Sequence, residues 1–262
     1  MRANQCESPG GKRTEAASLT GVTLVLSLIA CCGFSVFVCA YARTGERLLE
    51  QSVRKQGMIY LEQAERLETA GEYENAARHY RLALDAEFDA HKYRTYTLKR
   101  LGALLWWREG AEAALPYLQE AFQQPDAPIT LYEPLCDSLI QLGRHDDVYE
   151  VLSRWREDAR RGSDREQEAL SYYYEGKAFQ KTGDEAKARE AFMAGTQVLP
   201  GGRSAYELGA GFERKGDDGL ALLYLEQFLE TGSGERARHA RTLIDEILQR
   251  RAKNDGFPHS DE

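Results

Sequence analysis

The stretch that decides the fold is "AERLETAGEYENAARHYRLA", residues 64–83. Small and large residues follow one another in it at fixed steps: Ala64, Leu67, Gly71, Ala76, Tyr80 and Ala83. Steps of three or four residues follow one face of a helix. A glycine midway suits a turn, because glycine tolerates a positive φ. The stretch therefore predicts two antiparallel helices joined by a turn at Gly71.

The same spacing recurs four more times. The new starting residues, Gly102, Cys136, Gly176 and Gly209, follow the preceding start by 38, 34, 40 and 33 residues. The longer intervals contain polar joints where loop length is free to vary. Single positions depart from the pattern: Glu109 takes the place of the second turn glycine, with Gly110 next to it, and the third repeat has Cys136 and Val148 in its small positions. One helix pair cannot bury its own apolar face, so five pairs are expected to stack.

At this point the chain resembles the tetratricopeptide repeat (TPR) family. The resemblance covers about residues 57–235 and is clearest in "YYEGKAFQKTGDEAKAREAFMAGTQVLP", residues 173–200, which also carries the closing Pro200. It implies an all-α fold, an α-solenoid of about five helix-turn-helix repeats. The expected repeats are about 57–90, 95–128, 129–162, 169–201 and 202–235.

The segment 236–252 is expected to form a C-terminal capping helix. Its apolar residues form one helical stripe with charges opposite: Ala237, Ala240, Leu243, Ile244, Ile247 and Leu248. The last repeat of a stack needs a cover with a polar outer side. The tail 253–262 is expected to be disordered.

Near the amino terminus, residues 19–42 form an uncharged run of 24 residues. A helix of that length spans roughly 36 Å, enough to cross a hydrocarbon core of ~30 Å. The run is longer than the apolar part of a secretory signal. It predicts an uncleaved transmembrane anchor between an N-terminal tail (1–18) and a juxtamembrane helical linker (43–56).

A rival interpretation of this run is a lipid anchor. "LIAC", Leu28–Cys31, resembles the bacterial lipoprotein box, in which Cys31 would be lipidated after cleavage. The apolar sequence after Cys31 favours the uncleaved anchor, because a lipoprotein usually turns polar at once. Basic residues flank both sides of the run, so they decide the orientation only weakly. The chain is therefore expected to be a single-pass protein of a bacterial inner membrane, with the repeats in the periplasm.

The composition and the motifs argue against nucleic-acid binding and against catalysis. The 262 residues carry a formal net charge of −8, which argues against nucleic acid as a partner. Only Cys136 of the five cysteines lies in the repeats, and no two of the five histidines are spaced as metal ligands on one helix face. No enzyme activity, cofactor or metal is expected. A remote alternative is an enzyme with an unrecognised site in the groove, and His79 and His145 are the first residues to test for it.

The resemblance also implies where a partner binds. In this family a peptide usually lies in the concave groove lined by the first helix of each pair. Carried over by position, the groove residues expected to bind a partner are Tyr96, Lys99, Trp106, Trp107, Tyr173, Lys177, Lys181, Tyr206 and Arg214. Trp106 and Trp107 cannot both face the core because adjacent helical residues point in different directions.

The expected function is that of a membrane-anchored scaffold or adaptor. It would bind a protein or peptide partner in the groove, in a cell-envelope assembly complex. The lipoprotein alternative places the same solenoid in outer-membrane biogenesis, secretion or pilus assembly. Self-association of the array stays open.

Overall fold

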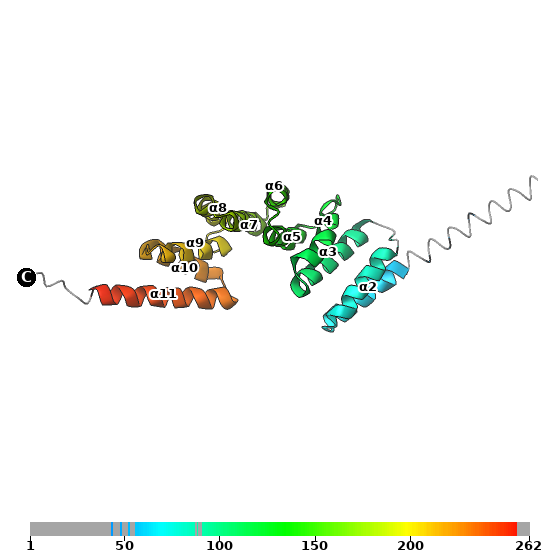
Figure 1. Cartoon of the computed structure of the whole chain (residues 1–262), viewed down its shortest axis with the longest axis horizontal. Helices are drawn as coiled ribbons and strands as arrows, with labels where there is room; N and C mark the ends of the chain where they lie inside the picture. The colour runs from blue at the N-terminus through cyan, green and yellow to red at the C-terminus, as the bar shows by residue number, and fades with distance from the viewer. Residues whose placement is uncertain are drawn as a thin grey trace, which may run out of the picture. The chain divides into compact units, whose positions relative to one another are not determined.

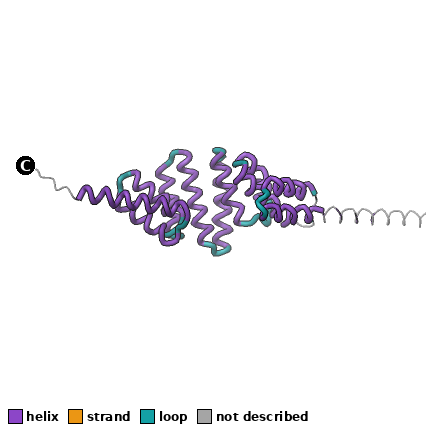
Figure 2. Tube along the Cα trace, turned by 90° about the horizontal axis from the view of Figure 1, so that it is seen from below, coloured by secondary structure: helices purple, strands orange, loops and turns teal. Residues whose placement is uncertain are grey.

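The computed structural model describes residues 56–86, 88 and 91–255, together with Arg43, Leu48 and Ser52. The chain divides into two compact units, Met1–Gln56 and Gly57–Glu262, and the helices below belong to the second, except that the first of them begins at Gln56. The expected tail 1–18 and apolar run 19–42 lie outside the described residues, and so does 256–262. The described part is built of helices joined by short loops and contains no strand (Figures 1 and 2).

The first described helix covers 56–69. It is followed in chain order by α2 (Tyr73–Asp85), α3 (His91–Arg108), α4 (Ala111–Phe122), the 3-10 turn η1 (Ile129–Leu131), α5 (Tyr132–Gln141), α6 (His145–Arg161), α7 (Arg165–Thr182), α8 (Glu185–Val198), α9 (Arg203–Arg214), α10 (Asp218–Thr231) and α11 (Gly234–Asp255). Five helix pairs precede α11, and their first helices are 56–69, α3, α5, α7 and α9. Every helix pair expected from the spacing is present.

The turn glycines lie where the sequence predicts them. Gly71, Gly143, Gly183 and Gly216 all have φ between +71° and +81°, and Gly110 has φ +97°. After the first four of these, the next backbone N–H bonds to the carbonyl five residues earlier, as in Glu72 to Leu67 at 2.8 Å. Residues other than glycine are strained in this conformation because they carry a Cβ atom. The turn therefore ends the first helix of each pair and reverses the chain.

The small residues let the two helices of a pair approach closely. A Cβ atom added at Gly102 would lie 2.6 Å from Leu118 Cδ2, and one added at Gly176 would lie 2.3 Å from Phe192 Cε1. Both distances are too short for real atoms, so the large residue of the second helix occupies the space that a side chain at the glycine would need. The alternation of small and large residues thus sets the distance between the helices.

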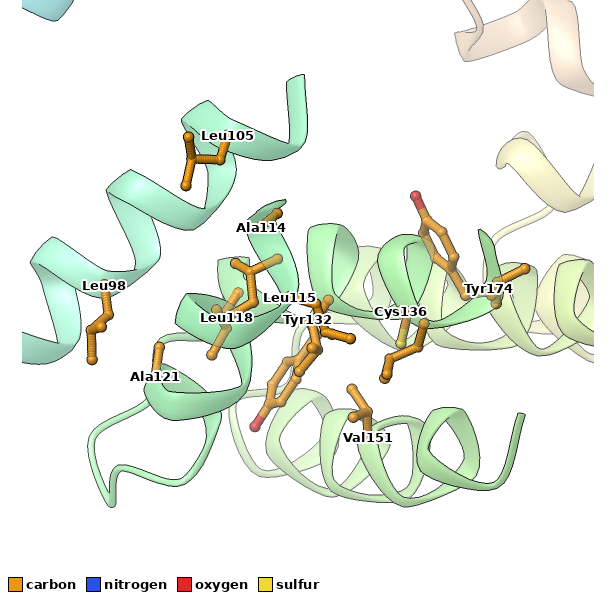
Figure 3. Close-up of a cluster of buried hydrophobic side chains, with 14 of the residues drawn as sticks. Leu98, Leu105, Ala114, Leu115, Leu118, Ala121, Tyr132, Cys136, Val151 and Tyr174 are labelled. Atoms are coloured by element: carbon orange, nitrogen blue, oxygen red, sulfur yellow. The ribbon is translucent and has the colours of Figure 1, made fainter. Parts of the chain in front are cut away.

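The core continues from pair to pair. The second helix of each pair packs on the first helix of the next, and α10 packs on α11. Figure 3 shows buried side chains of α3, α4, α5, α6 and α7 gathered between these helices, Leu118, Tyr132 and Val151 among them. Phe212 contacts both this cluster and a second one formed by α9, α10 and α11. Stacking therefore buries the apolar face that a single pair would expose.

The helix α11 covers the end of the stack. It runs from Gly234 to Asp255, starting two residues before and ending three residues after the expected segment 236–252. Its Ala237, Ala240 and Ile247 are buried against the last pair, whereas Leu248 is 50% exposed. Leu248 was expected in the apolar stripe. It lies outside because it is turned about 100° from the fully buried Ile247, beyond the buried side of the helix.

No helix in the described part of the chain is both long enough and apolar enough to cross a membrane. The expected anchor, residues 19–42, lies outside that part. In the expected linker 43–56, the described residues Arg43, Leu48, Ser52 and Gln56 are helical.

Candidate partner-binding face

The first helices of consecutive pairs lie against one another. Contacts join α3 to α5, α5 to α7, α7 to α9 and α9 to α11. Among the described residues, no second helix makes a comparable contact with the second helix of the next pair. The stack therefore curves with its first helices on the inner side. We call the exposed and half-buried side chains of 56–69, α3, α5, α7 and α9 on this side the first-helix face.

The nine residues expected to bind a partner lie on three of these helices. They are Tyr96, Lys99, Trp106 and Trp107 on α3, Tyr173, Lys177 and Lys181 on α7, and Tyr206 and Arg214 on α9. Eight of them are exposed or half-buried. The ninth, Tyr173, is only 4% exposed.

Side-chain contacts bridge neighbouring helices along this face. Five of the eight exposed or half-buried residues make polar contacts of this kind: Tyr96 with Glu65 (2.8 Å), Lys99 with Thr130 (3.3 Å), Trp106 with Asp137 (2.8 Å), Lys177 with Glu207 (3.6 Å) and Tyr206 with His239 (2.7 Å). Polar contacts near the surface contribute little free energy each, so a partner can replace them at small cost. Within the described residues, Trp107, Lys181 and Arg214 make no such bridge.

Glu133 connects three pairs at the centre of the face. It lies on α5 and accepts hydrogen bonds from Tyr174 of α7 at 3.1 Å and from Arg203 of α9 at 2.5 Å. Burial, followed by the nearby Glu133 carboxylate, raises the pKa of Tyr174, so the phenol stays protonated and remains a donor. The bond to Arg203 is charge-assisted and fixes the position of α9 relative to α5.

The position of Tyr173 differs from the expected one. Its ring lies beneath two guanidinium groups, those of Arg203 and Arg236, whose carbons are 5.9 and 6.0 Å from the ring centre. Burial, followed by the Glu207 carboxylate, raises the pKa of Tyr173 to about 12. Tyr173 is therefore not an open aromatic anchor but part of the lining of a cavity of about 480 Å³.

Arg203 and Arg236 were missed by the sequence reasoning. They stand 33 residues apart, one repeat length, and each lies in the first turn of its helix. The segment after residue 235 was expected to have only a covering role. If the repeat spacing had been applied to that segment as well, it would have assigned Arg236 to the position that Arg203 has in the fifth repeat.

The two adjacent tryptophans, Trp106 and Trp107, point in different directions, as the helix geometry requires. Trp107 is 63% exposed, and its ring packs edge-on against Tyr73 with 5.1 Å between ring centres. The Arg108 guanidinium lies 5.5 Å from the Trp107 ring and 5.6 Å from the Tyr73 ring. Trp106 is half-buried and donates to Asp137. Of these two tryptophans, Trp107 therefore offers the large exposed aromatic surface, and such side chains are common anchors in interfaces.

The two histidines and the cysteine considered for catalysis or metal binding do not lie on the exposed first-helix face. His79 is on α2 and His145 begins α6, both second helices, so neither belongs to the first-helix face. Cys136 is fully buried, and burial raises the pKa of its thiol. In the part of the chain that the structure describes, no three His, Cys, Asp or Glu side chains are grouped to hold a metal ion.

Comparison with known proteins bears on the fold. No model of a protein family matches the chain, and no curated protein matches its sequence. Among solved structures, the apo form of RapI has a TM-score of 0.60 at 12% identity, covering 80% of this chain and 68% of RapI. PilF of Pseudomonas aeruginosa has a TM-score of 0.53 at 14% identity, covering 79% and 95%. MamA has a TM-score of 0.52 at 21% identity, covering 67% and 91%.

All three neighbours are tetratricopeptide repeat structures. This chain has the TPR fold. The expected all-α solenoid is thereby confirmed for the described residues. At these identities the likeness concerns the fold alone.

Proposed function

We propose that this protein is a membrane-anchored scaffold that binds a protein partner along the first-helix face, in a cell-envelope assembly complex. The observation that carries the proposal is the curvature of the stack. It turns the first helices inward, and on them Trp107, Lys181 and Arg214 make no polar bridge to another helix among the described residues. An inward-curved surface lets a polypeptide touch several repeats at once.

Binding, rather than catalysis, accounts best for the residues on this face. Its aromatic side chains and Arg214 are of the kinds enriched at interfaces. The histidines weighed for an enzyme, His79 and His145, lie on the second helices. We therefore propose no catalytic role.

The first prediction concerns where the partner binds. A photoreactive benzoylphenylalanine is placed at Trp107 or Lys181 on the first-helix face and, as matched controls, at Glu190 or Leu223, which are exposed on α8 and α10. Irradiation of cells carrying the full chain is expected to give a discrete adduct, seen on a blot, from the face positions only. Mass spectrometry of the adduct then identifies the partner, and an adduct of chain with chain would identify self-association.

Adducts that form equally well at Glu190 and Leu223, or only there, would contradict the proposed face. A chain that gives no discrete adduct at any of several face positions would contradict partner binding on this side of the stack. The comparison is internal because all four variants carry the same probe in a helix.

The second prediction concerns the membrane. The uncharged run 19–42 supports a single span, with the repeats in the periplasm of a bacterial cell. A tag at the carboxyl end is expected to resist protease in intact cells and to be digested once the outer membrane is permeabilised. Protection until lysis would overturn the periplasmic location. The mass of the purified chain distinguishes the alternative, because lipidation at Cys31 removes the residues before it and adds acyl chains.

A further inference from the structure

The cavity beside Tyr173 lies at the carboxyl-terminal end of the first-helix face. Its walls come from α7, from the first turns of α9 and α11, from the end of α10, and from the loops 199–202 and 232–233. The end of α10 is fastened to the first of these loops, since Thr231 Oγ1 donates to the Gly201 carbonyl at 2.7 Å. A Cβ atom on Gly201 would lie 2.5 Å from Thr231 Oγ1, so only glycine permits this contact. The cavity is thus held open by the packing of two repeats and α11.

The lining side chains carry more positive than negative charge. Arg203 and Arg236 line the cavity, against one acid, Glu166. Arg203 already bonds to Glu133, and Arg236 donates to the neutral Tyr173 hydroxyl at 3.4 Å. No carboxylate among the described residues lies within 4.0 Å of the Arg236 guanidinium. Arg236 is therefore a solvent-exposed cation at the edge of the cavity, without an acidic partner within that distance among the described residues.

The rest of the lining is largely apolar. Leu170, Leu199 and Phe228 line the cavity together with the Tyr173 ring. The volume of about 480 Å³ lies within the range of ligand pockets, which combine an apolar lining with a few placed polar groups. An occupant that fits both features has an apolar side chain and, next to it, an anionic group.

We propose that this cavity binds an apolar side chain of the partner polypeptide together with an adjacent carboxylate, which pairs with Arg236 and Arg203. The proposal rests on the proposed function and specifies what the partner presents. Guanidinium groups match the planar fork of a carboxylate. Glu166 at the same cavity opposes a more highly charged anion such as phosphate. The carboxylate comes from a chain end or from an Asp or Glu side chain.

The test uses the full chain in detergent micelles and small probes in place of the unidentified partner. N-acetyl-leucine presents a terminal carboxylate, N-acetyl-leucyl-glutamate diamide presents a side-chain carboxylate, and N-acetyl-leucinamide presents neither. The readout is the NMR signal of the arginine Nε–Hε groups. At least one carboxylate probe is expected to shift the Arg236 and Arg203 signals, and which one does so identifies the source. Equal shifts with the neutral amide, or none with either carboxylate, would overturn the proposal.

Three variants check that the charge is responsible. Arg236→Gln is expected to weaken binding of the active carboxylate probe about fivefold or more, the loss typical of a charge-assisted contact. Glu166→Gln is expected to tighten it about twofold, which a misfolded chain could not do. Arg241→Gln, an exposed change on the same helix as Arg236, is expected to leave it unchanged. Unaltered binding by Arg236→Gln would overturn the proposal.

The result is separable from that of the proposed function. Crosslinks from Trp107 and Lys181 report partner binding at positions that do not line the cavity. A chain that forms those crosslinks but ignores both carboxylate probes keeps its partner and refutes only the cavity's role.

Discussion

Replacing Gly209 by alanine is expected to lower the free energy of unfolding by about 2 to 3 kcal/mol, the upper range for overpacking a core. Gly209 lies on α9 against α10. The new Cβ would be 2.6 Å from Leu225 Cγ and 3.0 Å from the Leu225 backbone nitrogen. A side chain can move aside, but the nitrogen belongs to α10, so the two helices would have to separate. Urea unfolding of the full chain, followed by far-ultraviolet circular dichroism, measures the loss.

The matched control lies two residues further along the same helix. A Cβ atom at Gly211 would meet nothing closer than Arg214 Nη2 at 3.9 Å. Alanine is the better helix former by about 0.5 to 1 kcal/mol, so Gly211→Ala is expected to leave stability unchanged or raise it. If the two substitutions lowered the free energy of unfolding equally, the close contact between α9 and α10 at Gly209 would not be the cause of the loss.

Both glycines illustrate what the sequence could predict. Gly209 falls on the repeat spacing and Gly211 does not, and only Gly209 makes the close helix contact. The turn glycines were predicted in the same way, including the displaced Gly110 of the second repeat. These features depend on contacts within one pair, which span few residues and recur in every repeat. Periodicity therefore reveals them.

The face could be predicted only in part. The helix period and the repeat spacing together place Trp107 and Lys181 outward. Whether an amphipathic residue such as Tyr173 is exposed to solvent depends on how far each helix pair is rotated relative to the next. That rotation is set by contacts such as Glu133 with Arg203, which are 70 residues apart. No local pattern encodes a contact between residues of different repeats, so the burial of Tyr173 and the cavity beside it were not foreseen.

The second large effect is expected where two pairs join. Trp155 on α6 is fully buried, with its ring centre 5.7 Å from that of Tyr132 on α5 and 5.7 Å from that of Tyr174 on α7. Its Nε1 donates to Gln167 Oε1 at 3.0 Å. Trp155→Ala would empty this space and strand the Gln167 acceptor. We expect the free energy of unfolding to fall by about 3 to 5 kcal/mol, the usual loss for a buried aromatic residue.

The position of Trp155 adds a second consequence. Each pair in a stack is stabilised mainly by its neighbours, so weakening one joint reduces the coupling between the halves on either side. The Trp155→Ala chain is therefore expected to unfold over a broader range of urea, with fluorescence and circular dichroism transitions that no longer coincide. Trp107→Ala is the matched control. Because Trp107 is 63% exposed, its loss is expected to cost less than about 1 kcal/mol and to leave the transition sharp. Similar losses from the two tryptophans would mean that the third and fourth pairs are not joined through the aromatic stack.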